Sequence, residues 1–547
     1  SKTNLDYDKI LSEIGDFGPY HLRQFIFICF AVFVGSGFLF TFVFTASDLN
    51  YRCLIPECEN ASHTTYMTPW LSNAIPFNDK DPSKCERFST INNNNQQSDF
   101  NCFNQNISKF IDEKKCEEFI YENDEVTILK EWNLTCAPNK WKLTLVGTIN
   151  NIGQFVCFPL TGFLSDRFGR RLVLTIGTFA AGIIGLLKSF SVNYEMFLLL
   201  EFLEPMIGAG IYATSLILAT ELVKPGKRVM ALCVIDTFYA TGLAYISLLA
   251  MIFHNWRTFL RVYYAPTLLT ISYFWLMTES VRWLLSKGDS SKAINILSKM
   301  AKANGKPDPT ETLEQLESCS INNEKSDEKA DKRESLKDVL KHPFLLLRIA
   351  NCSFCWLTVV FVYYGLSLNS VTLAGNKYLN FISVSLIELP SFWLNYIIVE
   401  RLGRRKTLCG GLICSGLACI FYELIGGEYF WIQLLLFLFG KFSISLSFSV
   451  LYVYTSEIYP TNLRQSLLSV CSMFGRIGSM IAPQMPLLAL IWAPLAVVLY
   501  GTVSLLAGLL VLRLPETKNI QLPDTIEEAK FLKQTDKNFA SSIVSGN

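Results

Sequence analysis

Charged residues are scarce in this chain of 547 residues. Aspartate, glutamate, lysine and arginine together make up 17% of it, whereas a soluble domain usually carries about 25%. The two signs almost balance, with 48 basic and 47 acidic residues and a formal net charge of +1. Because nucleic-acid binding depends on an excess of positive charge, we expect no nucleic-acid partner.

Other chemical groups are also missing. The four histidines lie far apart in the sequence, and no run of the form G-x-x-x-x-G-K-[ST] occurs. These absences exclude a phosphate-binding loop of that type and a grouped metal site. We therefore predict neither an enzyme nor an ATP-driven pump, and we expect no metal and no resident cofactor. The first 20 residues are polar and acidic, so we predict no cleavable signal peptide there.

Apolar sequence is what the chain has instead. Half of the residues are hydrophobic and 41 are phenylalanine. Apolar runs of about 20 residues, the length of a membrane-spanning helix, recur from end to end. The pattern predicts an all-α polytopic protein in the lipid bilayer, with twelve spans at 24–45, 143–164, 172–190, 195–219, 229–253, 259–277, 344–366, 377–399, 407–425, 430–454, 466–488 and 491–514.

Polar segments divide these spans into groups. Spans two to six occupy 143–277, and spans seven to twelve occupy 344–514. The polar segments that lie before, between and after the spans are 1–23, 46–142, 278–343 and 515–547.

The distribution of basic residues predicts the orientation of the chain. The loops at 165–171, 223–228 and 400–406 and the segment 278–343 are basic, whereas the loop at 190–194 has no lysine or arginine. Loops rich in lysine and arginine stay in the cytoplasm. We therefore expect both termini and the central segment to be cytoplasmic, and the first polar insert to be extracellular.

The insert at 46–142 has the features of an exported segment. It contains three N-x-S/T glycosylation acceptors, at Asn60, Asn106 and Asn133. An even set of cysteines in such a segment predicts three disulfides, although six cysteines allow 15 pairings. The six are Cys53, Cys58, Cys85, Cys102, Cys116 and Cys136.

The central segment 278–343 combines a charge-rich middle with apolar flanks. "SSKAINILSKMAK" at 290–302 and "ESLKDVLKH" at 334–342 resemble short amphipathic surface helices. The sequence between them has few apolar residues and is expected to be flexible or loosely helical.

The chain contains an internal repeat. "GFLSDRFGRR" (162–171) matches "IIVERLGRR" (397–405), and "ATELVKPGKR" (219–228) matches "TSEIYPTNLR" (455–464), at an offset of roughly 235 residues. The chain is therefore predicted to consist of two six-span halves. A transporter with repeated halves binds its substrate between them near the midplane and alternates access by rocking one half against the other.

The repeated motifs predict a conformational latch. Their acids and arginines can pair across the cytoplasmic gap and hold the outward-open state shut on the inside. The alternative is that these loops only anchor the topology. The residues of the latch are Asp166, Arg167, Arg170, Glu221, Glu400, Arg401, Arg404 and Glu457.

We single out seven ionisable residues within the predicted spans, because such residues are functional candidates by default. We expect Glu423 to be interfacial and Lys441 to snorkel or to pair internally. Glu201 and Glu204 share a helix face and are expected to support packing. The remaining three, Asp236, Glu388 and Arg476, are the candidates for ligand contact.

Arg476 suits a substrate that carries a carboxylate. Its planar guanidinium can hold a carboxylate through two parallel hydrogen bonds, while acids and aromatic faces suit a quaternary or protonated amine. Two alternatives remain open: the three residues form a packing network, or Arg476 pairs with Glu388 inside the protein.

Several motifs resemble a known family. "GFLSDRFGRR" resembles the signature of the major facilitator superfamily. Over nearly the whole chain, "EWNLTC" (131–136), "ESVRWLLSKG" (279–288), "YTSEIYPTNLR" (454–464) and "LPETK" (514–518) resemble the organic cation/anion/zwitterion transporter family. The chain departs from it at Thr278 and Val281, where the family pattern usually has prolines.

Within this family, "YYGLSLN" (363–369), "IELP" (387–390), "TFYATG" (237–242) and "GKFSISLSFSVLYVYTSE" (440–457) are most similar to the carnitine/zwitterion branch. Arg476 stands where carriers of simple cations tend to have aspartate and where anion and carnitine carriers have arginine. Phe392 lies near the place of a second cation in the anion carriers. The resemblance puts five aromatic residues in spans that line the cavity, although packing is an alternative role for each: Tyr212, Tyr239, Trp356, Tyr363 and Tyr364.

The resemblance implies a monomeric, multi-pass carrier of the plasma membrane. It would move small organic cations or carnitine-like zwitterions by alternating access. Part of the branch is coupled to sodium, so sodium coupling is an expectation here, although the sequence locates no sodium site. The alternatives are an organic anion carrier and, in a different class, a receptor or scaffold that does not transport.

Overall fold

The computed structural model describes residues 17–56, 58–59, 65–78, 81–89, 110–112, 116, 118–306, 339, 341–425, 429–460, 463–518, 523, 526 and 528. The chain divides into two compact units. The first comprises Ser1–Val43, Thr144–Phe253 and Arg257–Asn547, and the second comprises Phe44–Leu143 and His254–Trp256. The first unit holds the apolar helices, and the second corresponds to the polar insert.

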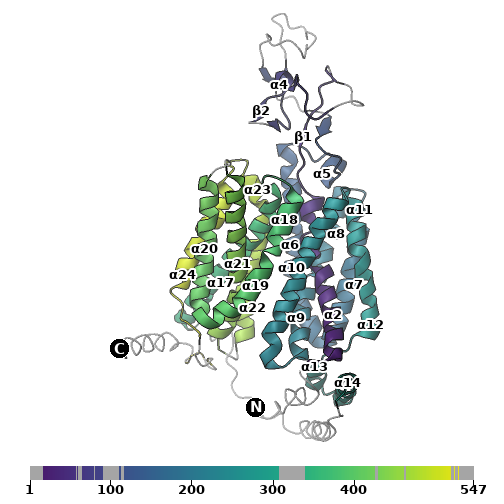
Figure 1. Ribbon diagram of the computed structural model, residues 1–547, viewed down its shortest axis with the longest axis vertical. Coiled ribbons are helices and arrows are strands. Elements are labelled where there is room, and N and C mark those ends of the chain that lie inside the picture. Colours follow the sequence, from purple (N-terminus) through teal and green to yellow (C-terminus); the bar gives the residue numbers. More distant parts are fainter. Residues whose placement is uncertain are drawn as a thin grey trace, which may run out of the picture. The chain divides into compact units, whose positions relative to one another are not determined.

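The helices of the first unit form two groups, which we call the first half and the second half. Figure 1 shows the first half in purple to teal and the second half in green to yellow. The first half contains α2 (Pro19–Gly35), α6 (Ala137–Phe168), α7 (Arg170–Lys188), α8 (Tyr194–Gly208), α9 (Ile211–Leu222), α10 (Arg228–Ile252), α11 (Trp256–Tyr264) and α12 (Tyr273–Leu276). Short 3-10 turns, η1 (Ser36–Leu39) and η3 (Ala265–Ser272), complete it, and α3 (Phe42–Thr45) follows η1.

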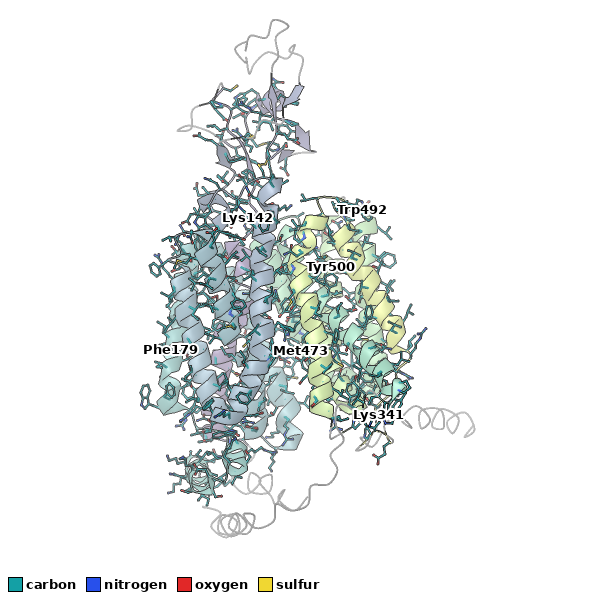
Figure 2. The ribbon with its side chains drawn as sticks, turned by 180° about the vertical axis from the view of Figure 1, so that it is seen from behind. Lys142, Phe179, Lys341, Met473, Trp492 and Tyr500 are labelled. Atoms are coloured by element: carbon teal, nitrogen blue, oxygen red, sulfur yellow. A yellow bond between two sulfur atoms is a disulfide. The ribbon has the colours of Figure 1, made fainter. Side chains whose placement is uncertain are left out.

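The second half begins with α17 (Pro343–Asn369). Figure 2 views both halves from behind, with Phe179 of α7 labelled in the first half and Tyr500 in the second. The other elements of the second half are η4 (Ser370–Thr372), α18 (Lys377–Leu386), α19 (Glu388–Leu402), α20 (Arg404–Ile425), α21 (Phe430–Ile458), α22 (Arg464–Ile481), η5 (Ala482–Gln484), α23 (Met485–Leu488) and α24 (Leu495–Val511).

Ten helical stretches within the described residues are long and apolar enough to cross a membrane. They coincide with ten of the twelve predicted spans. The predicted sixth span is instead divided into α11, η3 and α12, and the predicted twelfth is α24, with 17 residues. The all-α fold class is confirmed, since the only sheets in the described residues are three short two-stranded ones in the polar insert.

Proline and glycine explain the breaks within the spans. The fourth span divides after Gly208, next to Gly210, and the eighth divides at Ile387, just before Pro390. Proline cannot donate a backbone hydrogen bond, and glycine costs the helix conformational entropy. Tyr212 follows the first break and Glu388 follows the second, whereas Asp236 and Arg476 lie within α10 and α22.

Two glycines shape the turns of the repeated motifs. Gly169 joins α6 to α7 with a φ of 103°, and Gly403 joins α19 to α20 with a φ of 89°. Residues with a side chain avoid this region of φ. We call the end of the bundle that carries these turns the basic end, because the basic loops lie there, and the opposite end the non-basic end.

The central segment adds two helices at the basic end, α13 (Val281–Ser286) and α14 (Ser290–Ala303) (Figure 1). Asp289 caps α14 by accepting from the Lys292 backbone N–H. The hydrogen bond from the Lys292 ammonium, followed by this backbone bond, lowers the pKa of the Asp289 carboxyl. The inner face of α14 buries Leu297 and Met300 against Tyr20 of α2. The predicted amphipathic helix at 290–302 is confirmed, whereas most of 334–342 lies outside the described residues.

The second unit is built from paired short strands and disulfides. Its strand pairs are β1 (Tyr51–Cys53) with β6 (Phe119–Tyr121), β2 (Phe77–Asn78) with β3 (Asp81–Pro82), and β4 (Arg87–Ser89) with β5 (Phe110–Asp112). The short helices α4 (Leu71–Ala74) and α5 (Ile128–Glu131) accompany them. Cys53 is bonded to Cys116 and Cys85 to Cys136; Cys58 is also disulfide-bonded, and Cys102 lies outside the described residues.

A buried arginine organises this small unit. Arg52 is fully buried and donates twice to the Glu59 carboxylate, at 2.6 and 2.9 Å. Its remaining N–H groups donate to the backbone carbonyls of Tyr66, Thr65 and Cys53, so all five donors are satisfied. Of the three glycosylation acceptors, Asn133 is exposed, and Asn60 and Asn106 lie outside the described residues.

Candidate functional site

Arg476 lies on α22 between the two halves, and the protein supplies it with no counter-ion within the described residues. Its guanidinium carbon lies 3.8 Å from the centre of the Phe158 ring, which belongs to α6 of the first half. It also interacts with the Tyr364 hydroxyl. A phenyl face attracts a cation weakly compared with a carboxylate. The internal Arg476–Glu388 pair that the sequence left open is not formed in this structure.

Asp236 of α10 is the acidic counterpart of Arg476. It accepts a hydrogen bond of 2.5 Å from the Tyr212 hydroxyl, and in the part of the chain that the structure describes it has no cationic partner. Tyr212 follows directly on the Gly208–Gly210 break and packs against Tyr239, with ring centres 5.2 Å apart. All three residues are intermediate in exposure.

Glu388, the third candidate, is already paired. Its carboxylate lies 2.8 Å from Lys441 Nζ of α21 and accepts a hydrogen bond of 3.0 Å from Tyr363. The Lys441 ammonium also donates to Ser367 at 2.7 Å and lies 3.3 Å from the Tyr363 ring centre. Glu388 is the first residue of α19, where the helix dipole favours an anion. Lys441 thus pairs internally, one of the two roles expected for it.

Aromatic side chains surround these charges on the second-half side. Trp356 is buried, donates to Thr455 at 3.0 Å, and packs edge-on against Tyr452 at 4.5 Å between ring centres. Phe448 contacts Trp356, Tyr363 and Tyr452. The Tyr452 hydroxyl lies within electrostatic range of both Arg476 and Asp236. The sequence did not single out Phe158, Phe448 or Tyr452, because apolar aromatics are common in membrane helices.

The halves meet from the midplane towards the non-basic end. There Thr144 of α6 donates to Gln484 at 3.1 Å, and Gln484 donates to Thr148 at 2.6 Å. Ser247 of α10 donates to the Tyr378 carbonyl at 2.8 Å. Nearer the midplane, the Phe40 ring stacks on Tyr364 at 5.4 Å. These contacts join the two halves on the non-basic side of the charges.

A second charged cluster lies inside the first half, and its cation was missed by the sequence reasoning. Lys188, the last residue of α7, contacts both Glu201 and Glu204 of α8, and all three side chains are fully buried. Tyr264 donates to Glu204, and Asn150 of α6 donates to Glu201 at 2.8 Å. The available signal was that two acids in span four need a partner, and Lys188 is the one basic residue in spans three and four.

The latch residues form two equivalent clusters at the basic end. Arg170 contacts Asp166 at 3.0 Å and Glu221 at 3.6 Å. Arg404 contacts Glu457 at 3.1 Å and Glu400 at 3.9 Å. Each of these pairs joins residues of the same half. Pairing between the two halves across the cytoplasmic gap stays a prediction about another conformation. Arg167 and Arg401 are exposed.

Two further acids complete these clusters. Glu279 accepts from the backbone N–H groups of Arg170 and Arg171 at the start of α7. Glu516 accepts in the same way from Arg404 and Arg405 at the start of α20. Each carboxylate therefore caps a helix N-terminus whose first N–H groups have no partner within the helix. In the sequence both residues stand out only as parts of family motifs, although they occur at the repeat offset.

Solved structures of known transporters have the same fold. The partially occluded, inward-open xylose transporter of E. coli matches 90% of this chain and 99% of its own, with a TM-score of 0.58 and 14% identity. The same proton:xylose symporter with a bound bromo-deoxy-glucose covers 94% of this chain and 99% of its own, with a TM-score of 0.55 and 17% identity. At these identities the likeness establishes the fold alone, which is that of the major facilitator superfamily.

Sequence comparisons identify the relatives of the chain. The model of the "Sugar (and other) transporter" family matches residues 88–528. "Organic cation/carnitine transporter 2" of Mus musculus is 31% identical, covering 96% of this chain and 94% of the relative. "Organic cation transporter protein" of Drosophila melanogaster is 29% identical, covering 96% and 95%. "Solute carrier family 22 member 3" of Rattus norvegicus is 29% identical, covering 96% of both.

The chain therefore belongs to the organic cation/anion/zwitterion transporter family of the major facilitator superfamily. The family and fold are those of multi-pass membrane transporters and not of enzymes. The family predicted from the sequence motifs is thus confirmed.

Proposed function

We propose that this carrier transports small organic ions that bear both a positive group and a carboxylate, with simple organic cations as weaker substrates. One observation carries the proposal: Arg476 and Asp236, of opposite charge, are both left without an ionic partner by the described part of the protein. Arg476 and Asp236 both interact electrostatically with the Tyr452 hydroxyl. Holding unpaired charges in a membrane protein is costly, and a substrate with both charges neutralises them together.

The geometry assigns each end of the substrate. The guanidinium of Arg476 takes the carboxylate, displacing the Phe158 ring from its face. Asp236 takes the ammonium, with the rings of Tyr212 and Tyr239 beside it as cation-binding faces. Glu388 is left out of this assignment, because Lys441 and Tyr363 already satisfy its carboxylate.

The alternatives fit the charges less well. An organic anion satisfies Arg476 and leaves Asp236 without a partner, and a simple cation does the reverse. The names of the relatives, which include carnitine as well as organic cations, agree with a substrate that carries both charges. A non-transporting receptor or scaffold would keep the binding site without uptake.

We further propose that the closed non-basic end faces outward across the plasma membrane, with the basic end and both termini in the cytoplasm. The contacts of Gln484 with Thr144 and Thr148 then have to open for a substrate to enter from outside. Both charges of the site come from one chain, so we propose a monomeric carrier without a resident cofactor. Sodium coupling stays a proposal that the uptake assay addresses.

The test is uptake into cells expressing the protein, normalised to surface protein. The substrates are labelled carnitine, a quaternary amine without a carboxylate, and an aromatic carboxylate, each with sodium or with lithium in its place. We expect carnitine to be taken up best and the aromatic carboxylate least. Preference for the aromatic carboxylate would favour the anion carrier, and absence of all uptake at normal surface expression would favour the receptor.

Asp236→Asn tests the negative charge of the site independently of the positive charge of Arg476. It removes the negative charge and keeps a side chain that can accept from Tyr212. We expect it to lower uptake of carnitine and of the simple quaternary amine alike, because both lose the same partner. Glu423→Gln is the matched control, because it also changes an acid to an amide within a span but lies outside the site. Equal uptake by both variants would contradict the assignment of Asp236.

A further inference from the structure

The cluster of Lys188, Glu201 and Glu204 carries an unbalanced charge in a fully buried place. One ammonium faces two carboxylates, and the exposed fraction of all three side chains is 0%. A buried net charge is destabilising even after relaxation of the surroundings. Two carboxylates at one site also disfavour ionising together. Something must therefore balance the second carboxylate.

The neighbouring elements supply no second positive charge. Tyr264 of α11 donates to Glu204, and Tyr263 beside it donates to the Val34 carbonyl. Thr41 lies 3.4 Å from Lys188 Nζ. Arg257 and Arg261 approach only the segment after Lys188, where they donate to Ser189 and Ser191 and not to either carboxylate. Among the described residues, Lys188 is the sole cation in contact with Glu201 and Glu204.

Each carboxylate oxygen of the cluster contacts a group that carries N–H or O–H hydrogens. Glu201 Oε2 is buried and lies 2.8 Å from the Lys188 ammonium. The other Glu201 oxygen accepts from Asn150 at 2.8 Å. Glu204 accepts from both Lys188 and Tyr264. The groups around these oxygens are hydrogen-bond donors, whereas a sodium ion needs several oxygen lone pairs.

We propose that this cluster is a proton-binding site, in which Glu201 and Glu204 share one exchangeable proton, and that its occupancy is coupled to transport. The proposal rests on the proposed function, because it adds a coupling ion to the same transport cycle. The step is simple acid–base chemistry: a proton from water forms one O–H bond on a carboxylate, and the cluster becomes neutral. Release reverses the step and returns the net charge of −1.

A directed chain of hydrogen bonds links this cluster to the boundary between the halves. The Tyr364 hydroxyl of the second half donates to Gln154 at 3.4 Å, Gln154 donates to Asn150 at 2.9 Å, and Asn150 donates to Glu201. Hydrogen bonds to a charged acceptor are about twice as strong as neutral ones, and linked bonds polarise one another. Protonation of Glu201 therefore weakens the end of the chain and, with it, the contact that Tyr364 makes across the halves.

The same chain leads to the substrate site. Tyr364 stacks on Phe40 and also interacts with Arg476. Substrate binding at Arg476 and proton binding at Glu201 therefore act on opposite ends of one hydrogen-bonded connection. Two sites that bias a shared element are coupled in both directions, so substrate binding also changes proton affinity.

The experiment uses the full-length protein in liposomes that contain a pH-sensitive dye, with the membrane potential held at zero. Labelled carnitine uptake is measured across external pH values with and without a pH gradient. For the wild type we expect uptake to change by up to about tenfold per pH unit, the scale set by one coupled proton. Substrate addition should also produce a dye response. Glu201→Gln, which fixes the neutral form, should abolish both the pH dependence and the dye response.

Two further variants keep the proposal falsifiable. Glu204→Gln replaces Glu201→Gln if the latter does not reach the membrane, and it should also flatten the pH profile. Glu423→Gln is the control and should retain the wild-type profile. Uptake that ignores the pH gradient, with equal profiles in all variants, would overturn the proton site and leave the proposed function standing. Uptake driven by sodium alone, and lost in Glu201→Gln, would also overturn it in favour of a sodium ion. No carnitine uptake at any pH would instead count against the proposed function.

Discussion

The guanidinium carbon of Arg476 lies 3.8 Å from the centre of the Phe158 ring, across the boundary between the two halves of the protein. An aromatic face here takes the position that an internal carboxylate would otherwise occupy. This contact stabilises the arginine by roughly 0.5–2 kcal/mol, which is less than a buried ionic partner provides. We therefore expect the site to prefer a substrate that carries a carboxylate.

Substitution of Arg476 should change which substrates are carried. Removing one member of a buried charge pair costs about 3–5 kcal/mol, so Arg476→Ala should lower carnitine uptake by orders of magnitude. Arg476→Lys should rescue only part of it, because an ammonium cannot form the two-fold pair. Arg476→Asp should favour simple cations. The measurement is the ratio of carnitine uptake to uptake of a quaternary amine without a carboxylate. An unchanged ratio in all three variants would mean that Arg476 is structural.

Glu388 should act on stability and not on substrate preference. Glu388→Gln leaves the Lys441 ammonium buried without its counter-ion, and we expect a loss of about 3–5 kcal/mol and low surface expression. The double variant Glu388→Gln/Lys441→Gln removes both charges and should recover expression. Its uptake ratio of carnitine to a simple quaternary amine should match the wild type. A selective loss of cation uptake in the well-expressed double variant would instead place Glu388 in contact with the substrate.

Asp166 should affect transport more than folding. Its side chain is 77% exposed, and its pair with Arg170 is therefore worth less than about 1 kcal/mol. We expect Asp166→Asn to keep thermal stability and surface expression but to lower uptake, because the latch then forms poorly in the outward-open state. Glu279→Gln is the comparison. It weakens the cap of α7 and should cost about 0.5–2 kcal/mol of stability. Uptake at the wild-type rate in Asp166→Asn would restrict these loops to topology.

The polar insert should be glycosylated and closed by disulfides. Asn133 is exposed and stands close in sequence to Cys136, which is bonded to Cys85. We expect glycosidase treatment of protein from mammalian cells to increase its gel mobility, and Asn133→Gln to reduce the shift. Thiol reagents should label the cysteines of the insert only after reduction. No mobility change, together with labelling of unreduced protein, would contradict the extracellular placement.

The spans, the repeat and the polar insert could be read from the sequence because each depends on local composition. A run of about 20 apolar residues predicts a membrane helix without knowledge of its neighbours, and ten of the twelve were found as helices of sufficient length. The sixth span was harder to predict, because η3 has the same apolar composition as an α-helix. The disulfide pairing was also beyond the sequence, since six cysteines admit many arrangements.

The sequence by itself determined which charges lie within the membrane: Arg476, Asp236, Glu388, Lys441 and the acids of span four. Only the tertiary structure decided which of them neutralise one another. Glu388 meets Lys441, and the two glutamates meet Lys188, because the rotation and depth of the packed helices bring these side chains together. Within the described residues, Arg476 and Asp236 have no such partners. Pairing is a property of three-dimensional packing, since a charge can be neutralised only by a group within a few ångströms, whatever their separation along the chain.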